Sequence, residues 1–352
     1  LFSAVQSVNL EISGRILMKV ATWRGEAEFT IDEVPMPGLE PGLAIVKVDS
    51  AGVCGTDVHV TQGLFTEWDP PTVLGHEFSG VIVEIGEGVP RGRIGEKVAC
   101  LPQPGCGECG ACRTWTMGHC ERLPRRAGGF AEYALVDQNA AYPLPEGLDL
   151  ETASMVEPAG CALSCVDSLG PQKKGFDALV IGAGLLGLFT VAFLKLRGAG
   201  RVIVSEPHPI RREMARQFGA DVLHDPSESP VDEIVEELTD GTGVQVAAEA
   251  VGKPELVARC VELARPRGHA LMVGVSPRRS PLSVDLFEMH FREVSVRGAM
   301  GAGNSFGQAL NLLPQIDLEG VVGGRYPLEE IASVIEMSAA GDGVKYVMAP
   351  ND

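Results

Sequence analysis

The sequence is short of basic residues and of aromatic residues. Its 352 residues include 29 Lys and Arg against 47 Asp and Glu, which gives a formal net charge of −18 at pH 7. Such a charge repels phosphate backbones and anionic lipid, so we expect neither a nucleic-acid partner nor attachment to a membrane surface. Aromatic residues make up only 5% of the chain. A small polar ligand therefore suits it better than a large stacked ring.

The sequence also gives no sign of export or of repeated architecture. Residues 1–17 contain no basic segment ahead of an apolar run, so they do not resemble a secretory signal, and we expect a cytoplasmic protein. The first strand pattern begins near Met18, which makes residues 1–17 an N-terminal extension. We find no internal repeat and no low-complexity tract. The length and the 45% hydrophobic content predict a globular chain of two domains.

One uncharged run, Ala178 to Leu194, approaches the minimum length of a membrane-spanning helix. It begins with β-branched residues, continues with Gly-Ala-Gly-Leu-Leu-Gly and ends with helix formers. This is the order of a strand, a tight turn and a buried helix, so we expect no membrane span here.

The turn in this run has the pattern G-x-G-x-x-G, with Gly182, Gly184 and Gly187, and with Leu185 and Leu186 between the last two. The first glycine permits the tight turn, the second lets a pyrophosphate approach the backbone, and the third lets the helix pack against the strand. The helix N-terminus then faces the phosphates. The pattern predicts a dinucleotide-binding loop.

A second strand pattern ends at Glu206, about twenty residues past Gly187, where a ribose-binding carboxylate belongs. Such a carboxylate accepts hydrogen bonds from the ribose hydroxyls and repels a 2′-phosphate, which favours NAD over NADP. Arg211 and Arg212 follow closely and weaken this preference, because they could bind a 2′-phosphate. The alternative is that both are solvated residues at the start of the next helix.

Strand and helix patterns then alternate as far as residue 300. This alternation predicts an α/β protein with a doubly wound parallel sheet, a Rossmann cofactor domain over residues 166–300. Residues 18–165, which are rich in Gly, Pro and short strand patterns, precede it, and residues 301–352 follow it with a short helix pattern.

Four cysteines lie within fifteen residues, at Cys106, Cys109, Cys112 and Cys120. Their spacing suits four thiolates around one tetrahedral zinc ion that holds the segment together. Disulfides are one alternative, although the chain has an odd number of cysteines, nine, and cytoplasmic thiols are kept reduced. A four-cysteine iron–sulfur cluster is the other.

A second set of metal-binding residue types lies apart from these cysteines. Cys54 and His76 offer a thiolate and an imidazole, while Glu77 and Glu157 offer carboxylates that could complete three protein ligands. Three ligands and one open position are typical of a catalytic zinc. Taken singly, each residue has a simpler interpretation: a buried small cysteine, a core histidine and two solvated acids.

Together, these motifs resemble the zinc-dependent medium-chain dehydrogenase/reductase superfamily of alcohol, polyol and threonine dehydrogenases. The resemblance covers about residues 18–350 and rests, in order, on CGTD, GHEFSGVIVEIGEGV, the four cysteines, EPAG and GAGLLG. It implies a GroES-like, mainly-β catalytic domain, with residues 301–352 as its C-terminal part, beside the Rossmann domain. It also implies two zinc ions per chain, one catalytic and one structural, and NAD as the cofactor.

The resemblance assigns roles in the catalytic domain residue by residue. Cys54 and His76 become ligands of the catalytic zinc, Asp57 the carboxylate that orients His76, and Thr56 the hydroxyl that contacts the substrate. Second-sphere carboxylates of this kind fix the tautomer of a ligating imidazole. His59 matches the proton-relay histidine of alcohol dehydrogenases, with a surface histidine of no role as its alternative.

The third zinc ligand separates the branches of the superfamily. Classical alcohol dehydrogenases have a cysteine at the position of Glu157, whereas the sorbitol, threonine and glucose branches have the glutamate of an E-P motif. In those branches the two glutamates can trade places as the ligand, or one can hold the zinc-bound water, so Glu77 and Glu157 both remain candidates. The polyol and threonine branches usually have a histidine near the position of Ser164, and this departure leaves the substrate open.

Other assignments depend on the resemblance alone. The turn Val273, Gly274 and Val275 would face the nicotinamide, with a plain strand end as the alternative. Lys345 lies where the family often has a basic residue, and we interpret it as a solvated lysine. Three further cysteines are interpreted as buried small apolar residues: Cys161, Cys165 and Cys260. The strand pattern at 293–300 usually pairs across a subunit interface in this superfamily, so we expect a homodimer or a homotetramer.

We therefore expect a zinc- and NAD-dependent dehydrogenase that transfers a hydride between the cofactor and a secondary alcohol of a polyol, cyclitol or sugar. L-Threonine is the alternative substrate. The alternative of another class is a nucleotide-binding member without catalysis, although such a protein would need none of the candidate ligands.

Overall fold

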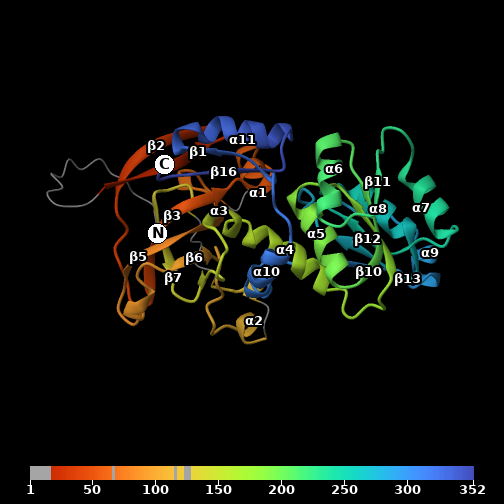
Figure 1. Ribbon diagram of the computed structural model, residues 1–352, viewed down its shortest axis with the longest axis horizontal. Helices are drawn as coiled ribbons and strands as arrows, with labels where there is room; N and C mark the ends of the chain where they lie inside the picture. Colours follow the sequence, from red (N-terminus) through yellow and green to blue (C-terminus); the bar gives the residue numbers. More distant parts are fainter. Residues whose placement is uncertain (1–16, 66–67, 115–116, 123–127) are drawn as a thin grey trace.

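The structure is a computed structural model that describes residues 17–65, 68–114, 117–122 and 128–352. The expected extension at residues 1–17 lies outside the described residues apart from Leu17, which begins the first strand. Two halves lie side by side along the long axis of the molecule (Figure 1). None of the helices in the described residues is long and apolar enough to cross a membrane.

The first half, here called the parallel half, is a six-stranded sheet in the order β11-β10-β9-β12-β13-β14 with every neighbouring pair parallel. Its strands are β9 (Phe176–Ile181), β10 (Ala199–Ser205), β11 (Val222–His224), β12 (Val244–Glu249), β13 (Ala264–Met272) and β14 (Ser295–Gly298). Its helices are α5 (Leu185–Leu196), α6 (Pro209–Gln217), α7 (Val231–Thr239), α8 (Pro254–Leu263) and α9 (Leu286–Phe291). The predicted Rossmann architecture is confirmed.

The central strand β9 explains why the uncharged run folds in this way. Ala178 and Val180 point into the core that contains α5, whereas Leu179 and Ile181 point into a second core with residues of α7 and α8. Helices cover both faces of the sheet, so residues 178–181 of the strand are all buried and all apolar.

The second half, here called the antiparallel half, contains a sheet in the order β15-β16-β3-β5-β6-β8, with β7 paired to β3, and a smaller sheet β2-β1-β4. Its strands are β1 (Leu17–Gly25), β2 (Glu28–Pro35), β3 (Leu43–Gly52), β4 (Thr72–Val73), β5 (Glu77–Ile85), β6 (Lys97–Cys100), β7 (Tyr133–Asp137), β8 (Ala141–Pro143), β15 (Val322–Tyr326) and β16 (Lys345–Met348). Its helices are α1 (Gly55–Thr61), α2 (Gly110–Arg113), α3 (Leu150–Ala153), α10 (Phe306–Leu312) and α11 (Ile331–Ala340).

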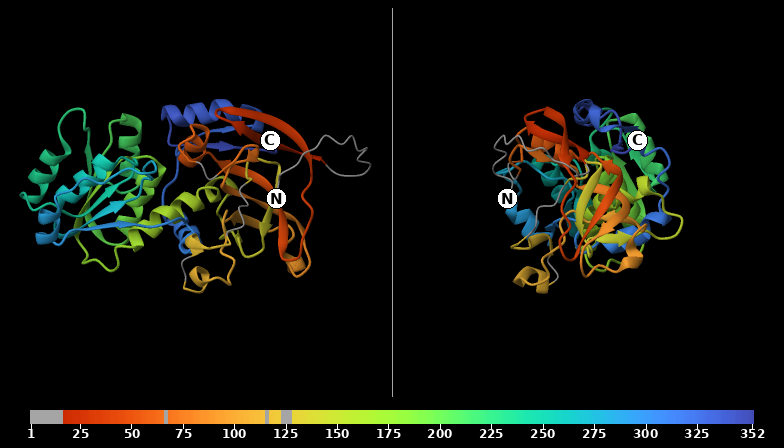
Figure 2. Two further views of the ribbon diagram at one scale, coloured as in Figure 1. Left: turned by 180° about the vertical axis from the view of Figure 1, so that it is seen from behind. Right: turned by 90° about the vertical axis from the view of Figure 1, so that its left-hand side faces the viewer.

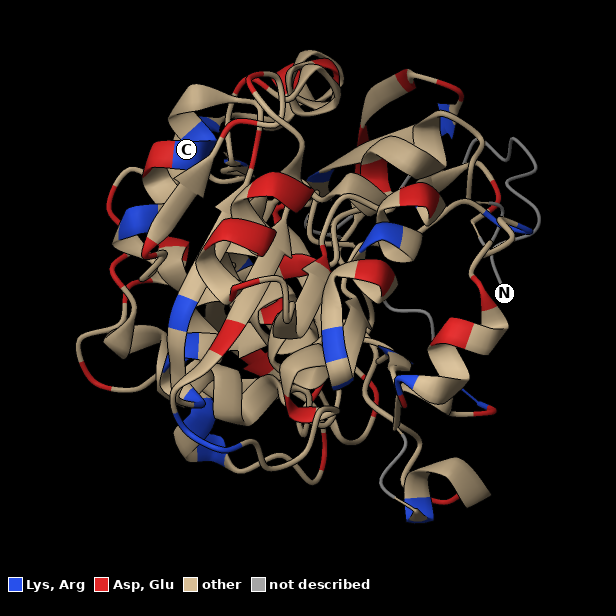
Figure 3. Ribbon diagram, turned by 90° about the vertical axis from the view of Figure 1, so that its right-hand side faces the viewer, with Lys and Arg blue, Asp and Glu red and all other residues tan. Residues whose placement is uncertain are grey.

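The chain therefore leaves the antiparallel half, builds the parallel half, and returns. The late strand β16 pairs with the early strand β3, and Figure 2 shows the blue C-terminal segment beside the red N-terminal strands. Helix α4 (Val156–Asp167) lies between the halves and packs against both α5 and α10. Lys and Arg are interspersed with Asp and Glu on the face of the parallel half shown in Figure 3.

Candidate active site

The structure brings three of the predicted catalytic-zinc residues together. Cys54 precedes α1, and His76 and Glu77 lie at the start of β5. One ligand atom from each, the Cys54 Sγ, a ring nitrogen of His76 and a carboxylate oxygen of Glu77, lies within 4.8 Å of the others. A thiolate, an imidazole and a carboxylate at this spacing are a donor set that fits zinc.

Asp57 fixes the local geometry of this cluster. The backbone N–H of Cys54 donates to Asp57 Oδ2 at 2.9 Å and so closes the first turn of α1. The other carboxylate oxygen, Asp57 Oδ1, lies 3.6 Å from His76 Nδ1, which leaves Nε2 as the ring nitrogen available to a metal. Burial lowers the pKa of His76, but the neighbouring Asp57 carboxylate and Cys54 thiol raise it by more, to well above its usual value.

Lys345 is not the solvated lysine that the sequence suggests. Its side chain is 3% exposed and forms an ion pair with the Oε2 of Glu77, whose side chain is 1% exposed. The Lys345 Nζ also donates to the carbonyl oxygen of Val53 at 2.8 Å. Burial lowers the pKa of Lys345, but Glu77, Cys54 and Asp57 together raise it by more, so the amine stays charged. Lys345 therefore lies beside the cluster of Cys54, His76 and Glu77, a position that the sequence did not predict.

The second candidate carboxylate, Glu157, lies on α4 and is half-buried. Among the described residues, the group within 4.8 Å includes Glu77 and leaves Glu157 outside. Burial raises the pKa of Glu157, and the nearby His76 partly opposes this shift. The thiol of Cys161 donates to Glu157 Oε1 at 3.3 Å and is only half-buried, whereas Cys165 and Cys260 are buried as expected.

Thr56 and His59 lie on α1, the helix that Cys54 precedes, and both are half-buried. The His59 ring meets the ring of Phe65 edge-on, with centroids 5.1 Å apart. Burial lowers the pKa of His59, so its neutral form predominates at neutral pH. Ser164, where a histidine is usual in related branches, donates to Ser305 Oγ at 2.9 Å and thereby joins α4 to the residue before α10.

The glycine loop has the conformation that its sequence predicts. Gly182 has a φ of +96°, and a Cβ on Gly187 would lie 2.0 Å from the carbonyl oxygen of Gly182. Both positions therefore require glycine. Glu206 lies against this loop, because its Oε2 accepts a hydrogen bond from the backbone N–H of Ala183 at 2.7 Å. Gly184 and Leu185 then lead into α5.

The remaining cofactor candidates lie around the same edge of the sheet. Val273 and Gly274 follow β13, and both backbone N–H groups donate to the carbonyl oxygen of Glu249. Leu186 is half-buried in α5, whereas Val275 is 58% exposed. These positions lie at the carboxyl ends of parallel strands, where open α/β sheets bind ligands.

Arg211 and Arg212 are neither simply solvated nor aimed at a free anion position. Arg211 donates through Nε and Nη2 to the carbonyl oxygen of Gly343. Arg212 forms an ion pair with Asp225 at 2.9 Å and donates to the carbonyl oxygen of Glu206 at 2.6 Å. Both side chains thus have protein partners beside the expected ribose position.

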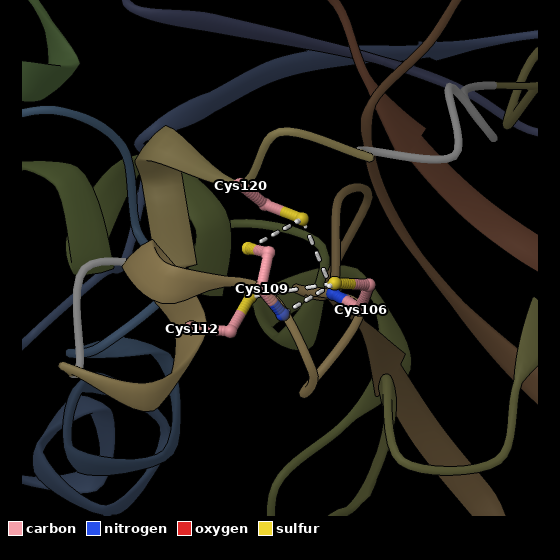
Figure 4. Close-up of side chains that lie close together, drawn as sticks. All are labelled: Cys106, Cys109, Cys112 and Cys120. Carbon is pink, nitrogen blue, oxygen red and sulfur yellow. Dashed lines mark hydrogen bonds between the residues drawn. The ribbon is translucent and has the colours of Figure 1, made fainter.

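The four clustered cysteines point their sulfur atoms at one another (Figure 4). The Sγ atoms of Cys106 and Cys112 are 4.0 Å apart, and those of Cys109 and Cys120 are 3.9 Å apart. Four sulfurs about 2.3 Å from a tetrahedral zinc would be about 3.8 Å apart, whereas a disulfide needs about 2.05 Å. All nine cysteines are free thiols. An iron–sulfur cluster would place further atoms between the thiolates, so the spacing fits one zinc ion.

The local charge of this cluster also suits a cation. Backbone N–H groups of Cys112 and Glu121 lower the pKa of Cys109 to about 6. Burial raises the pKa of Cys112 to about 12, so this thiol ionises only when a cation stabilises its thiolate.

Comparisons with known proteins agree with this architecture. Residues 40–146 match the alcohol dehydrogenase GroES-like domain, and residues 186–315 match the zinc-binding dehydrogenase family. L-Threonine 3-dehydrogenase from Pyrococcus abyssi is 35% identical over 78% of this chain and 80% of its own length. Scyllo-inosose 3-dehydrogenase from Thermotoga maritima is 34% identical over 90% of this chain and 89% of its own length.

A solved structure gives the same result. A protein from Sinorhizobium meliloti 1021, described as a zinc-binding dehydrogenase and bound to NADP, superposes with a TM-score of 0.89. It is 32% identical, and the match covers 96% of this chain and all of that one.

Proposed function

The chain belongs to the zinc-dependent medium-chain dehydrogenases, which makes it a secondary-alcohol dehydrogenase with zinc and a nicotinamide cofactor, and we propose that it oxidises a polyol, cyclitol or sugar with NAD. The cluster of Cys54, His76 and Glu77 carries this proposal. We assign the catalytic domain to residues 18–165 and 301–352 and the cofactor domain to residues 166–300.

The chain's own residues hold and move the reacting groups. A zinc ion held by the cluster supplies a Lewis acid for a hydroxyl oxygen, and the nicotinamide supplies the hydride acceptor. Asp57 keeps the His76 ring in one orientation. Thr56 would receive the proton of the substrate hydroxyl, and His59, neutral at pH 7, would pass it towards solvent.

The third ligand and its neighbours support a substrate with several polar groups. Glu77, which lies in the 4.8 Å cluster, is our choice for the ligand. This leaves the half-buried carboxylate of Glu157 to accept hydrogen bonds from further substrate hydroxyls. We choose NAD because the carboxylate of Glu206, beside the glycine loop, would repel a 2′-phosphate.

L-Threonine is the second candidate substrate, and the 35% identity to a threonine dehydrogenase favours it. The carboxylate of Glu157, which would accept hydrogen bonds from substrate hydroxyls, would also attract an ammonium group. The two candidates therefore need a direct comparison on one preparation.

The test is NADH formation by the purified zinc-loaded enzyme with polyols, inositols, aldoses, L-threonine and simple alcohols, each with and without a zinc chelator. We expect chelator-sensitive turnover on one polyhydroxy class. Turnover on L-threonine alone would replace this choice by the second candidate. No turnover on any alcohol, with both NAD binding and two zinc ions demonstrated, would overturn the catalytic proposal.

We also propose a homo-oligomer, a dimer or a tetramer. Strand β14 is the last strand of its sheet, and exposed apolar side chains lie nearby at Leu286, Phe287 and Phe291. An open strand edge beside apolar surface suits pairing with a second copy. Light scattering should give at least twice the mass of one chain, and a monomer would contradict the proposal.

A further inference from the structure

Helix α6 begins shortly after Glu206, the residue assigned to the cofactor ribose, and two of its side chains reach the antiparallel half. Arg211 donates to the carbonyl oxygen of Gly343 at 2.5 Å through Nη2 and at 3.1 Å through Nε. Gln217 donates through Nε2 to the carbonyl oxygens of Asp317 and Glu319, each at 3.0 Å. Both residues thus bind backbone across the boundary between the halves.

The turn that Arg211 binds leads directly to the cluster of Cys54, His76 and Glu77. It joins α11 to β16, as Figure 1 shows at the end of α11 that faces α6. A Cβ on Gly341 would lie 3.4 Å from Nη2 of Arg211, so the guanidinium also packs against this turn. Two residues after Gly343 comes Lys345, whose amine binds Glu77 and the carbonyl of Val53.

We propose that Arg211 is a positioning residue that ties the ribose side of the cofactor site to the metal side, with Gln217 as a second tie on the same helix. The inference rests on the proposed dinucleotide site. It differs from a 2′-phosphate contact, because Arg211 acts through the spacing of the two halves and favours NAD and NADP equally.

The energetic reason is preorganisation. A dinucleotide held by Glu206 in the parallel half would have to reach with its nicotinamide the cluster beside α1 in the antiparallel half. When the two halves are already held at the distance that the dinucleotide requires, its binding needs less free energy to order them, and its affinity is higher. ADP touches only the ribose and phosphate positions of the parallel half, so its affinity should not depend on the tie.

The test compares Arg211→Gln with Arg216→Gln by titration of the zinc-loaded enzyme with NADH, NADPH and ADP. Arg216 lies on the same helix and is a matched control, because its ion pair with Glu213 is within α6 and exposed. We expect Arg211→Gln to weaken the binding of NADH and NADPH by the same factor, about fivefold, as the loss of two donors to one carbonyl oxygen at a partly exposed site allows, and to leave the binding of ADP unchanged. Arg211→Lys keeps one charged donor group, so its loss of NADH and NADPH affinity should lie between that of Arg211→Gln and none.

Three other results would decide against the tie. Weakened NADPH binding with unchanged NADH binding would make Arg211 a 2′-phosphate residue. An equal loss for ADP would make it a direct contact of the adenosine half. Unchanged affinities, with or without a lower melting temperature, would reduce it to a structural bond. Wild-type protein that binds none of the three ligands would instead overturn the dinucleotide site itself.

Gln217→Leu should repeat the Arg211→Gln pattern, with a smaller loss of NADH and NADPH affinity.

Discussion

The amine of Lys345 and the carboxylate of Glu77 form an ion pair in the interior, 268 residues apart in the chain. The lysine lies at the start of β16 and the glutamate at the start of β5, and β3 lies between these strands in the sheet. A strand near the C-terminal end of the sequence thus supplies the counter-charge of a residue in the metal cluster.

Lys345→Met should destabilise the zinc-free protein by about 3 kcal/mol, because it leaves the buried carboxylate of Glu77 unpaired. Denaturant unfolding of the variant and the wild type measures this loss. The double variant Glu77→Gln with Lys345→Met should recover much of this loss, since neither member of the ion pair then leaves an unpaired charge. Equal stability of Lys345→Met and wild type would show that the carboxylate finds another partner.

Cys109→Ser should lower the zinc content from two ions to about one per chain, because the remaining three thiols no longer form a closed tetrahedral site. Elemental analysis of the purified variant gives the number directly. Cys260→Ala is the matched control: Cys260 is a buried cysteine of α8 and should keep both ions. A variant at Cys109 that still holds two zinc ions would rule out this assignment of the four cysteines.

Glu206→Gln should reduce the preference for NAD over NADP by roughly tenfold, since glutamine keeps an oxygen for the N–H of Ala183 but loses the charge that repels a 2′-phosphate. The ratio of kcat/KM for the two cofactors is the measurement. Glu213→Gln, at an exposed position of α6, should leave the ratio unchanged. An unaltered ratio in Glu206→Gln would mean that another residue distinguishes the 2′-hydroxyl of NAD from the 2′-phosphate of NADP.

His59→Gln should lower kcat for alcohol oxidation at pH 7 roughly a hundredfold, the lower end of the range of a lost proton-transfer group. Burial holds the pKa of His59 below its usual value of about 6.5, so the neutral form that accepts a proton is present above that pH and is lost as the pH falls through the lowered pKa. The wild-type rate should therefore decline on the acid side, and this decline should be absent in the variant. The pH profile of kcat tests both statements.

Contiguous patterns predicted much of this molecule. The glycine loop and the four cysteines each occupy a short stretch in which spacing alone sets the geometry, and the structure gives the sulfur and backbone distances that the spacing requires. The trio of Cys54, His76 and Glu77 needed the resemblance to a family as well, because each residue type alone is common in cores and on surfaces.

Partners distant in the sequence could not be predicted in this way. Lys345 was interpreted as solvated because a lone lysine usually is, and only the pairing of β16 with β3 brings it to Glu77. The apolar residues that follow it, in the strand KYVM, were the available signal of burial. Arg211 similarly carries no local sign of its partner, a backbone carbonyl 132 residues away.

The split of the antiparallel half between the two ends of the chain has a consequence for synthesis on the ribosome. The parallel half is contiguous from β9 to β14 and can close as soon as it has emerged, whereas the sheet around Glu77 lacks β15 and β16 until residues 322–348 appear. Until then the carboxylate of Glu77 has no lysine beside it. The antiparallel half is thus completed only after the parallel half, and Glu77 gains its ion pair only once Lys345 has emerged.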